Sequence, residues 1–587
     1  MSIDPSSVAS ILGVQVSYRD LRGGNAAQLP QQIAIAGQGE SAVTYPTTKW
    51  LSTSAAATGA RYGYRSPLYL AHKELQPLNG DGVGSVPVWI LPLSDHASGV
   101  AAAGSITPSG TTTKQTSYNA KVAGILGEAF TLPSGAIDVT DACRKIRESV
   151  ENKLGMPVVA TNSYGTVTAS AVTGAGDGTV TTLSATGTPL PGDYTLTCIT
   201  AAMDAGTFKL VDPNGNTVSV SVEVTGSPQE VGGITFTLTD GAADFEAGDF
   251  FTITVPATNV VLTSSWKGAS ANDIEVEIVA TESVGAVFTI VQPTGGLNNP
   301  SVSTALSAIG EDWVSMLLNC LEVADTTALD AYQNFAEPRW DSQVHKPLVC
   351  FTGNTDVSVN DATVVTSART SDRVNSLIAC PGSPNLPFVV AARALARIAS
   401  VANNNPAVDY VRQKLDTLTP GTDAEQWDWA TRDLANKRGC STVIVEDSVV
   451  YLGDVVTMWR PSGEDPPAYA NVVTIVKLQQ LLYNLALKFQ TTDWAAAPLI
   501  SDDDVTTNPA ARKPKHAKSE VNDVIDGLAD LAVLVDRETS KQSVTAVISS
   551  SNPNRLDIAG TVRVSGNTKI KNLDIGWGFN FGSTAAA

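Results

Sequence analysis

The sequence predicts a multidomain α+β chain, and three observations lead to that fold class. Its 587 residues exceed the size at which a single hydrophobic core stops growing, so several domains are expected. Hydrophobic residues at 43% and charged residues at 16% describe an ordered chain. The spacing of hydrophobic residues also changes along the chain, between the alternation of a strand and the period of a helix. We therefore expect an α/β core, a discontinuous β-rich domain with an inserted all-β sandwich or barrel, a C-terminal helical and β domain, and extended terminal strands.

Composition excludes several classes of function. The formal net charge of −20 argues against a protein that binds phosphate backbones, so no direct nucleic-acid partner is expected. The N-terminus lacks the basic region of a secretory signal, and Arg393 and Arg397 interrupt the best apolar run, so we expect a soluble chain without a membrane span. The six cysteines are scattered and form no metal-like pairing with the four histidines; small buried side chains are expected.

The chain begins with an N-terminal arm, residues 1–28, whose apolar and polar side chains alternate as in a strand. One face of this strand carries Leu12, Val14, Val16 and Tyr18. Residues 29–97 form the first part of the α/β core. The elements expected there are a strand over 32–37, a helix over 66–75 and a strand over 86–91. Strand, helix and strand in this order predict a βαβ unit.

The β-rich domain is expected over residues 98–164 and 258–290, with one helix. Thr140 or Asp141 is its predicted N-cap, and Gly155 is its stop. The apolar residues spaced along this helix are Ala142, Ile146, Val150 and Leu154. Between the two parts, residues 165–257 show no helical period but many short strands, which predicts an inserted all-β domain that projects from the surface. The stretch 272–278 resumes the strand pattern of the preceding domain.

Residues 291–455 are expected to complete the α/β core. Asn299 is the predicted N-cap of a helix that starts at Pro300. The elements that follow are strands over 315–321, 347–351 and 373–380, helices over 328–337, 361–368 and 387–401, and strands over 442–445 and 449–452. This alternation predicts a parallel or mixed sheet, which the βαβ unit near residues 30–91 completes.

The C-terminal domain, residues 456–560, contains two predicted helices. The first, over 469–489, is apolar over a wide face and is expected to be buried on much of its circumference. The second, over 519–537, is amphipathic, with Asp523, Asp526 and Asp530 on its outer face. The linker between them contains a basic run, which is either a solvated loop or a contact for an acidic surface. Its basic residues are Arg512, Lys513, Lys515 and Lys518.

The C-terminal arm, residues 561–587, carries the most informative pattern. Leucine, isoleucine and aromatic residues alternate with polar residues and glycine, and they are Leu573, Ile575, Trp577, Phe579 and Phe581. Each such side chain gains about 1.5–3 kcal/mol on burial. The strand therefore needs a sheet to join, and exchange of both terminal strands between subunits is our hypothesis.

Motifs for chemistry are scarce. No phosphate-binding P-loop is present, and the glycine-rich stretch 79–84 reads as an ordinary turn. His345, near Asp341 and Cys350, is the best candidate for a nucleophilic site, but no nucleophile-elbow motif accompanies it. We expect no catalytic residues, no metal and no cofactor. Two alternatives stay open: a hydrolase that uses the α/β domain around His345 with a carbohydrate-binding β module, and an adhesin or head-decoration protein.

Several pieces of the chain, in their order, resemble the contractile tail sheath proteins of bacteriophages, in particular those of Mu-like phages. They are residues 31–39, 79–88, 101–110, 295–300, 377–384, 560–566 and 572–581. The resemblance covers most of the chain outside residues 165–257, which instead resemble the all-β modules of phage head-decoration and tail proteins. The family's central domain is called subtilisin-like for its fold, and the lack of a usable triad here fits a non-enzymatic relative.

This resemblance implies a virion protein that is assembled in the host cytoplasm. Its subunits would form hexameric rings stacked helically around a tail tube, and contraction of this sheath would drive the tube through the host envelope. The implied partners are copies of the same chain, the tail tube protein, and baseplate and tail terminator proteins, with no direct nucleic acid and no membrane. Arg512, Lys513, Lys515 and Lys518 are then candidate contacts to the tube.

Overall fold

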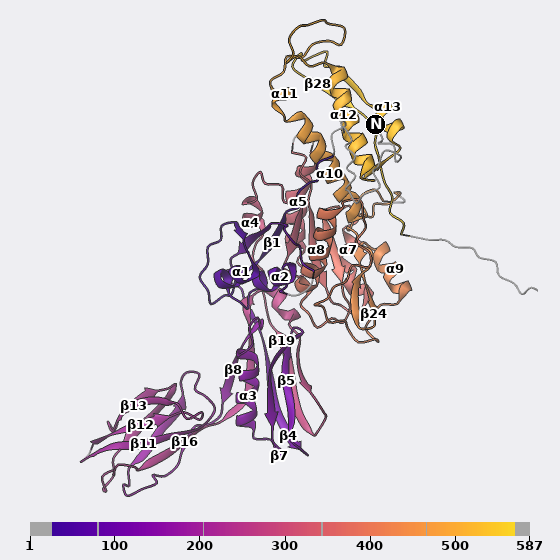
Figure 1. Cartoon of the computed structure of the whole chain (residues 1–587). Helices are drawn as coiled ribbons and strands as arrows, with labels where there is room; N and C mark the ends of the chain where they lie inside the picture. The colour runs from indigo at the N-terminus through magenta and orange to yellow at the C-terminus, as the bar shows by residue number, and fades with distance from the viewer. Residues whose placement is uncertain (1–25, 79–80, 204, 342–343, 465–466, 570–587) are drawn as a thin grey trace, which may run out of the picture. The chain divides into compact units, whose positions relative to one another are not determined.

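The computed structural model of the chain (Figure 1) describes residues 26–78, 81–203, 205–341, 344–464 and 467–569. These residues divide into two compact units, which are described separately. The main unit comprises residues 30–403 and 410–475, and the C-terminal unit comprises the described residues up to 29, residues 404–409 and the described residues from 476 onward.

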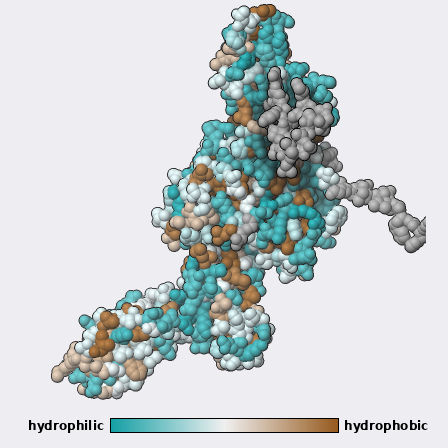
Figure 2. Space-filling view, in the orientation of Figure 1, coloured by the Kyte–Doolittle hydropathy of each residue, from teal (hydrophilic) through white to brown (hydrophobic). Residues whose placement is uncertain are grey.

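Hydrophilic residues cover most of the face seen in Figure 2, and hydrophobic residues form scattered patches on it. Among the described residues, every helix is too short or too polar to span a bilayer.

The main unit is built on a seven-stranded sheet in the order β2-β3-β1-β20-β21-β22-β23. All neighbouring strands are parallel except β2 and β3, so the sheet is mixed as predicted, and the βαβ unit completes it. The central strands are buried over their whole length, which explains their continuous apolar runs. The strands are β1 (Ile33–Gln38), β2 (Trp50–Ser52), β3 (Val88–Leu93), β20 (Met316–Asn319), β21 (Val349–Asn354), β22 (Asn375–Ala379) and β23 (Cys440–Ser441).

Eight helices accompany this sheet in the described part of the main unit. They are α1 (Ala55–Tyr62), α2 (Pro67–Leu75), α4 (Ser303–Ser307), α5 (Thr326–Ala336), α6 (Val359–Ala362), α7 (Val364–Ala368), α8 (Pro387–Asn404) and α9 (Trp429–Lys437). Ser66 caps α2 by accepting a hydrogen bond from the Tyr69 N–H at 3.1 Å. The single helix predicted over 361–368 is two short helices, because the Thr363 hydroxyl donates to the Val359 carbonyl at 2.6 Å at their junction.

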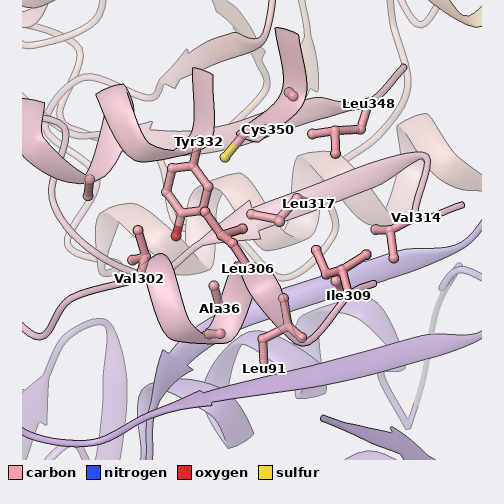
Figure 3. Packing of buried hydrophobic residues seen from close by; sticks show 14 of the residues in the cluster. Ala36, Leu91, Val302, Leu306, Ile309, Val314, Leu317, Tyr332, Leu348 and Cys350 are labelled. Carbon is pink, nitrogen blue, oxygen red and sulfur yellow. The ribbon is translucent and has the colours of Figure 1, made fainter. Parts of the chain in front are cut away.

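The core of the main unit lies between the sheet and its helices (Figure 3). Apolar side chains from β1, β3, β20 and β21 meet side chains from α4 and α5 there. The labelled residues are Ala36, Leu91, Val302, Leu306, Ile309, Val314, Leu317, Tyr332, Leu348 and Cys350. After β23, the strands β24 (Val443–Glu446) and β25 (Val449–Leu452) pair with each other as a separate hairpin.

The β-rich domain contains two sheets. One has the order β19-β4-β17-β8, with β7 (Gly135–Ala136) beside β4, and the other has the order β18-β5-β6. Their strands are β4 (Ala101–Thr112), β5 (Thr116–Val122), β6 (Ile125–Leu132), β8 (Val158–Tyr164), β17 (Ala257–Lys267), β18 (Val276–Ala280) and β19 (Ala286–Thr294). The strand predicted from residue 272 begins at Val276, because the 3-10 helix Ala269–Asp273 precedes it.

The helix of this domain, α3 (Val139–Glu151), differs from its prediction at both ends. Asp138 is the N-cap, and its carboxylate accepts hydrogen bonds from the N–H groups of Thr140 and Asp141 at 2.9 and 3.1 Å. Thr140 and Asp141 are therefore donors to the cap and not caps themselves. The helix ends before Leu154, which is 62% exposed.

Residues 165–256 form a β module with its own core. Five strands make one sheet, in the order β13-β12-β11-β16-β9, and three make another, in the order β10-β15-β14. Its buried cluster is drawn from residues 167–255 alone. The chain enters the module after Tyr164 and leaves it at Ala257, and these two residues are register partners on β8 and β17. The strands are β9 (Thr168–Ala169), β10 (Thr179–Ala185), β11 (Gly192–Ala202), β12 (Ala205–Val211), β13 (Thr217–Glu223), β14 (Pro228–Val231), β15 (Ile234–Thr239) and β16 (Phe250–Val255).

The C-terminal unit contains most of α10 (Val472–Phe489) and the elements that follow it. These are α11 (Thr492–Ala495), α12 (Pro514–Asp530), β26 (Leu534–Val535), α13 (Arg537–Ser543), β27 (Thr545–Ile548), β28 (Leu556–Ala559) and β29 (Arg563–Val564). The second predicted helix, over 519–537, is α12, and it begins and ends earlier than predicted. Pro514 occupies a first-turn position, where its missing N–H is not needed.

The mixed α and β multidomain class predicted from the sequence is confirmed. The sequence-based domain boundaries, at residues 28, 97, 164, 257, 290, 455 and 560, stay a prediction.

Candidate functional site

The residues predicted to exchange strands lie outside the described part of the chain. They are Leu12, Val14, Val16, Tyr18, Leu573, Ile575, Trp577, Phe579 and Phe581. The structure does describe the two segments from which the arms extend. We call residues 26–29 the N-terminal root and residues 565–569 the C-terminal root; both belong to the C-terminal unit.

Two amide side chains of α10 hold the N-terminal root. The Ala27 N–H donates to Asn484 Oδ1 at 2.7 Å, and Asn484 Nδ2 donates to the Ala27 carbonyl at 2.8 Å. The Leu29 N–H donates to Gln480 Oε1 at 2.8 Å, and Gln480 Nε2 donates to the Ala27 carbonyl as well. These side chains replace the partners that a neighbouring strand would supply, so the backbone of the root is held in one direction.

A buried lysine of the same helix holds the C-terminal root. Lys477 Nζ donates to the Ser565 carbonyl at 2.8 Å and to Asn567 Oδ1 at 2.7 Å, although the residue is only 1% exposed. Asn567 Nδ2 in turn donates to the Ala407 carbonyl at 2.9 Å. Burial lowers the pKa of Lys477, while the Asp409 carboxylate opposes that shift. A buried ammonium needs such acceptors, so the root and the lysine fix each other.

Lys477, Gln480 and Asn484 lie three and four residues apart and therefore share one face of α10. We call these three residues the arm clamp. Sequence reasoning missed the clamp, although a signal was present: polar residues at helical spacing inside a helix predicted to be buried must find buried partners. Which backbone groups they bind could not be found from the sequence, since Leu29 and Gln480 are 451 positions apart.

An apolar cluster packs under both roots. Its buried members are Val524, Ile525, Leu528, Val533, Leu534 and Val544 from α12 and the segments after it. Ala26 of the N-terminal root and Val564, next to the C-terminal root, pack against this cluster, as do Leu481 and Leu485 of α10. The clamp is thus backed by hydrophobic burial in addition to its hydrogen bonds.

The hairpin of β27 and β28 is the candidate acceptor for a strand. It is a two-stranded sheet, and no third strand pairs with it in the part of the chain that the structure describes. Val547 on β27 is 58% exposed and Ile558 on β28 is 36% exposed. A two-stranded sheet is marginal alone, and its open edges are templates for another chain.

The basic run is not the solvated loop that one interpretation of the sequence favoured, because α12 begins within it. Arg512 pairs with Asp493 at 3.2 Å, and Lys513 donates to the carbonyls of Asp502 and Asp504. Lys515 is exposed and Lys518 is half-buried, and neither forms an ion pair among the described residues. Beside the run, a cavity of about 390 Å³ is lined by Lys488, Thr491, Asp493, Trp494, Arg512, His516, Ser519 and Glu520.

The structure does not assemble the candidate nucleophilic site. Cys350 lies on β21 inside the core, and burial raises the pKa of its thiol well above the usual range. His345 is held near Asp341 by a backbone contact, its N–H donating to the Asp341 carbonyl at 2.8 Å. All six cysteines are buried, as predicted, and none forms a disulfide. The described residues include no group of three or more histidine, cysteine or acidic side chains placed to hold a metal.

Hydrogen bonds within the chain cross the crevice where an α/β sheet of this kind binds ligands, and a cavity of about 440 Å³ lies beside Asn299 and Asp325. Ligands bind beyond the carboxyl ends of the strands where the strand order reverses, here between β1 and β20. Gln38 at the end of β1 donates to the Lys267 carbonyl at 2.7 Å. Asn299 donates to Glu322 and Asp325, beyond β20, at 2.7 and 2.9 Å. The prediction that Asn299 caps a helix was wrong, since α4 begins at Ser303.

One curated relative agrees with the resemblance found in the sequence. No protein-family model matches the chain. The tail sheath protein of the Mu-like prophage FluMu of Haemophilus influenzae is 25% identical over 378 residues, which cover 59% of this chain and 76% of that protein.

Two crystal structures of sheath tail proteins are similar to the chain at low identity. The one from Listeria innocua covers 92% of this chain and 94% of its own, at 9% identity and a TM-score of 0.41. The one from Desulfitobacterium hafniense covers 94% and 100%, at 11% identity and a TM-score of 0.39. The prophage relative confirms the resemblance: this chain is a homologue of a Mu-like phage tail sheath protein.

Proposed function

We propose that the chain is the structural subunit of a contractile phage tail sheath. It polymerises as hexameric rings stacked around the tail tube, and contraction drives the tube through the host envelope. The observation that carries the proposal is the arm clamp: one helix holds the roots of both terminal arms through Lys477, Gln480 and Asn484. Buried polar side chains need hydrogen-bond partners, and three of them in this helix bind the segments from which the two arms extend, so the fold fixes where both arms leave the C-terminal unit.

Strand exchange is the proposed means of assembly. An arm of one subunit adds to the open edge of the β27–β28 hairpin of a neighbour, so that main-chain hydrogen bonds supply affinity. The alternating side chains of Leu573–Phe581 set the register, because a slip of one residue would turn the apolar face to solvent. Subunits stay connected while their main units reorient between two packings of different free energy.

Lys515 and Lys518 are the proposed contacts to the tail tube within the basic run, because Arg512 and Lys513 already have acidic or carbonyl partners in their own subunit. Baseplate and tail terminator proteins are the proposed partners at the two ends of the sheath, and the virion is the proposed location, after assembly in the host cytoplasm. No membrane and no nucleic acid are proposed as partners.

A structural role is favoured over the hydrolase alternative. The thiol of Cys350 is buried in the core of the main unit, so the candidate nucleophile is closed to a substrate. The β module is also a poor candidate for carbohydrate binding, which usually needs aromatic rings on the surface. Of its six aromatic residues, Phe250 is half-buried, and the other five are buried in its own core: Tyr194, Phe208, Phe236, Phe245 and Phe251.

Truncation of the C-terminal arm tests the proposal. A chain that ends at Asn567 keeps the Lys477 contacts to Ser565 and Asn567, so it is expected to stay folded yet fail to form tubes. A matched truncation after Gly582 keeps Leu573–Phe581 and is expected to assemble. Negative-stain electron microscopy gives the assembly state, and circular dichroism confirms folding. Normal tubes from the chain that ends at Asn567 would refute strand exchange.

A further inference from the structure

We infer that the arm clamp joins the two terminal arms into one mechanical element, so that tension between neighbouring subunits runs through α10 and bypasses the main unit. This inference rests on the proposed function in one respect, since it takes the arms as the links between subunits. It adds the path that force follows inside each subunit and the three residues that define it.

The positions of the two roots on α10 are the first argument. Lys477 and Asn484 are seven residues apart, which is about 10 Å along a helix at 1.5 Å per residue. Along the chain, by contrast, the roots are separated by nearly the whole sequence, including the main unit at residues 30–403 and 410–475. A force applied to both arms is therefore transmitted to the clamp before it reaches residue 30, where the main unit begins.

Each root is held by the clamp at more than one atom. At the N-terminal root, both the N–H and the carbonyl of Ala27 are bound to side chains of α10. At the C-terminal root, opening would leave the buried ammonium of Lys477 without the two acceptors it now has. A buried ammonium that loses hydrogen-bond acceptors is unfavourable, so the root resists displacement.

The consequence for contraction follows from this path. If force passed through the main unit, every reorientation of that unit would strain the links between subunits. With both arms tied to α10, the links and the C-terminal unit form a continuous net, and the main units can turn without opening it. The clamp residues are thus positioning residues for assembly.

Single-molecule force spectroscopy tests this path on the full-length chain, pulled from its first and last residues. The expected first rupture is the opening of one root, which releases a short length before the main unit unfolds. If the force passed through the main unit, the first rupture would release several hundred residues at about 3.3–3.6 Å each. That result would overturn the inference.

Variants of the clamp sharpen the test. Lys477→Met removes the charged hydrogen bonds, and the first rupture at a fixed force is expected to be roughly tenfold faster or more. Lys488→Met is the matched control on the same helix, because Lys488 pairs with Glu520 at 2.9 Å and contacts neither root through the bonds described above. Equal rupture rates for the two variants would overturn the inference.

Two further points keep the test decisive. If Lys477→Met fails to fold by circular dichroism, Asn484→Leu opens the other root, and the same acceleration of the first rupture is expected. The measurement uses single chains, so it is independent of assembly. Tubes without the short first rupture would refute the inference alone, and the short first rupture in a chain that never forms tubes would refute the proposed function alone.

Discussion

Excision of the β module is expected to leave the rest of the chain folded and able to assemble. Tyr164 and Ala257 are register partners on adjacent antiparallel strands, so an Asn-Gly pair in place of residues 165–256 would close β8 and β17 as a two-residue hairpin. The module also carries its own buried cluster, so its removal takes no residue from the core of the seven-stranded sheet. The excision thus removes the module from the β-rich domain at the two residues where the chain enters and leaves the module.

The expected loss of stability is small because few contacts join the module to its host. Tyr164 donates its hydroxyl to the Pro189 carbonyl at 2.6 Å, and Arg144 donates to Asn214 at 2.7 Å. Each bond contributes about 0.5–1.5 kcal/mol, so the remaining fold should lose about 1–3 kcal/mol. Trp266→Ala is a contrasting change inside the β-rich domain itself. That fully buried side chain should cost about 3–5 kcal/mol.

Differential scanning calorimetry measures the stability of the chain without the module, and electron microscopy shows whether it assembles. The deleted chain is expected to lose one transition and to keep the others within a few degrees, and to form tubes of normal appearance. Aggregation of the deleted chain, or a loss of stability as large as that of Trp266→Ala, would show that the module is part of the host's fold. Folded protein without tubes would show that the module takes part in assembly.

Two other outcomes are expected. Lys515→Glu together with Lys518→Glu should still give sheath without tube but weaken attachment to purified tubes by roughly tenfold; unchanged co-sedimentation would refute the tube contact. Burial lowers the pKa of His72 to about 4, although a hydrogen bond with Gln76 opposes the shift, so the unfolded chain takes up a proton first as pH falls. Stability against urea should therefore fall between pH 6.5 and 4, and this loss should persist in His96→Gln, whose side chain is exposed, but shrink in His72→Gln.

Much of the secondary structure could be predicted because its signals are local. Pro67 and the cap Ser66 predict the start of α2, and the alternation over 250–255 predicts β16. One error arose where a side chain has distant partners. Asn299 looks like a cap by its position before Pro300, but its amide is used by carboxylates more than twenty residues away. A local pattern cannot rank such competing uses of one polar side chain.

The candidate site divides in the same way. The alternation at the two chain ends needs no structure to be recognised, since a period of two follows from the geometry of a strand. The order of the seven strands and the hydrogen-bond partners of Gln38, Asn299 and Lys477 depend on segments brought together by folding.

By itself, the sequence predicts strand-forming arms at both ends, and it determined that a largely apolar helix precedes the second arm. Only the tertiary structure decided that Lys477, Gln480 and Asn484 bind the roots of both arms. The physical reason is that periodicity reports which face of an element is buried, whereas the partner of a buried polar group is chosen by the whole fold.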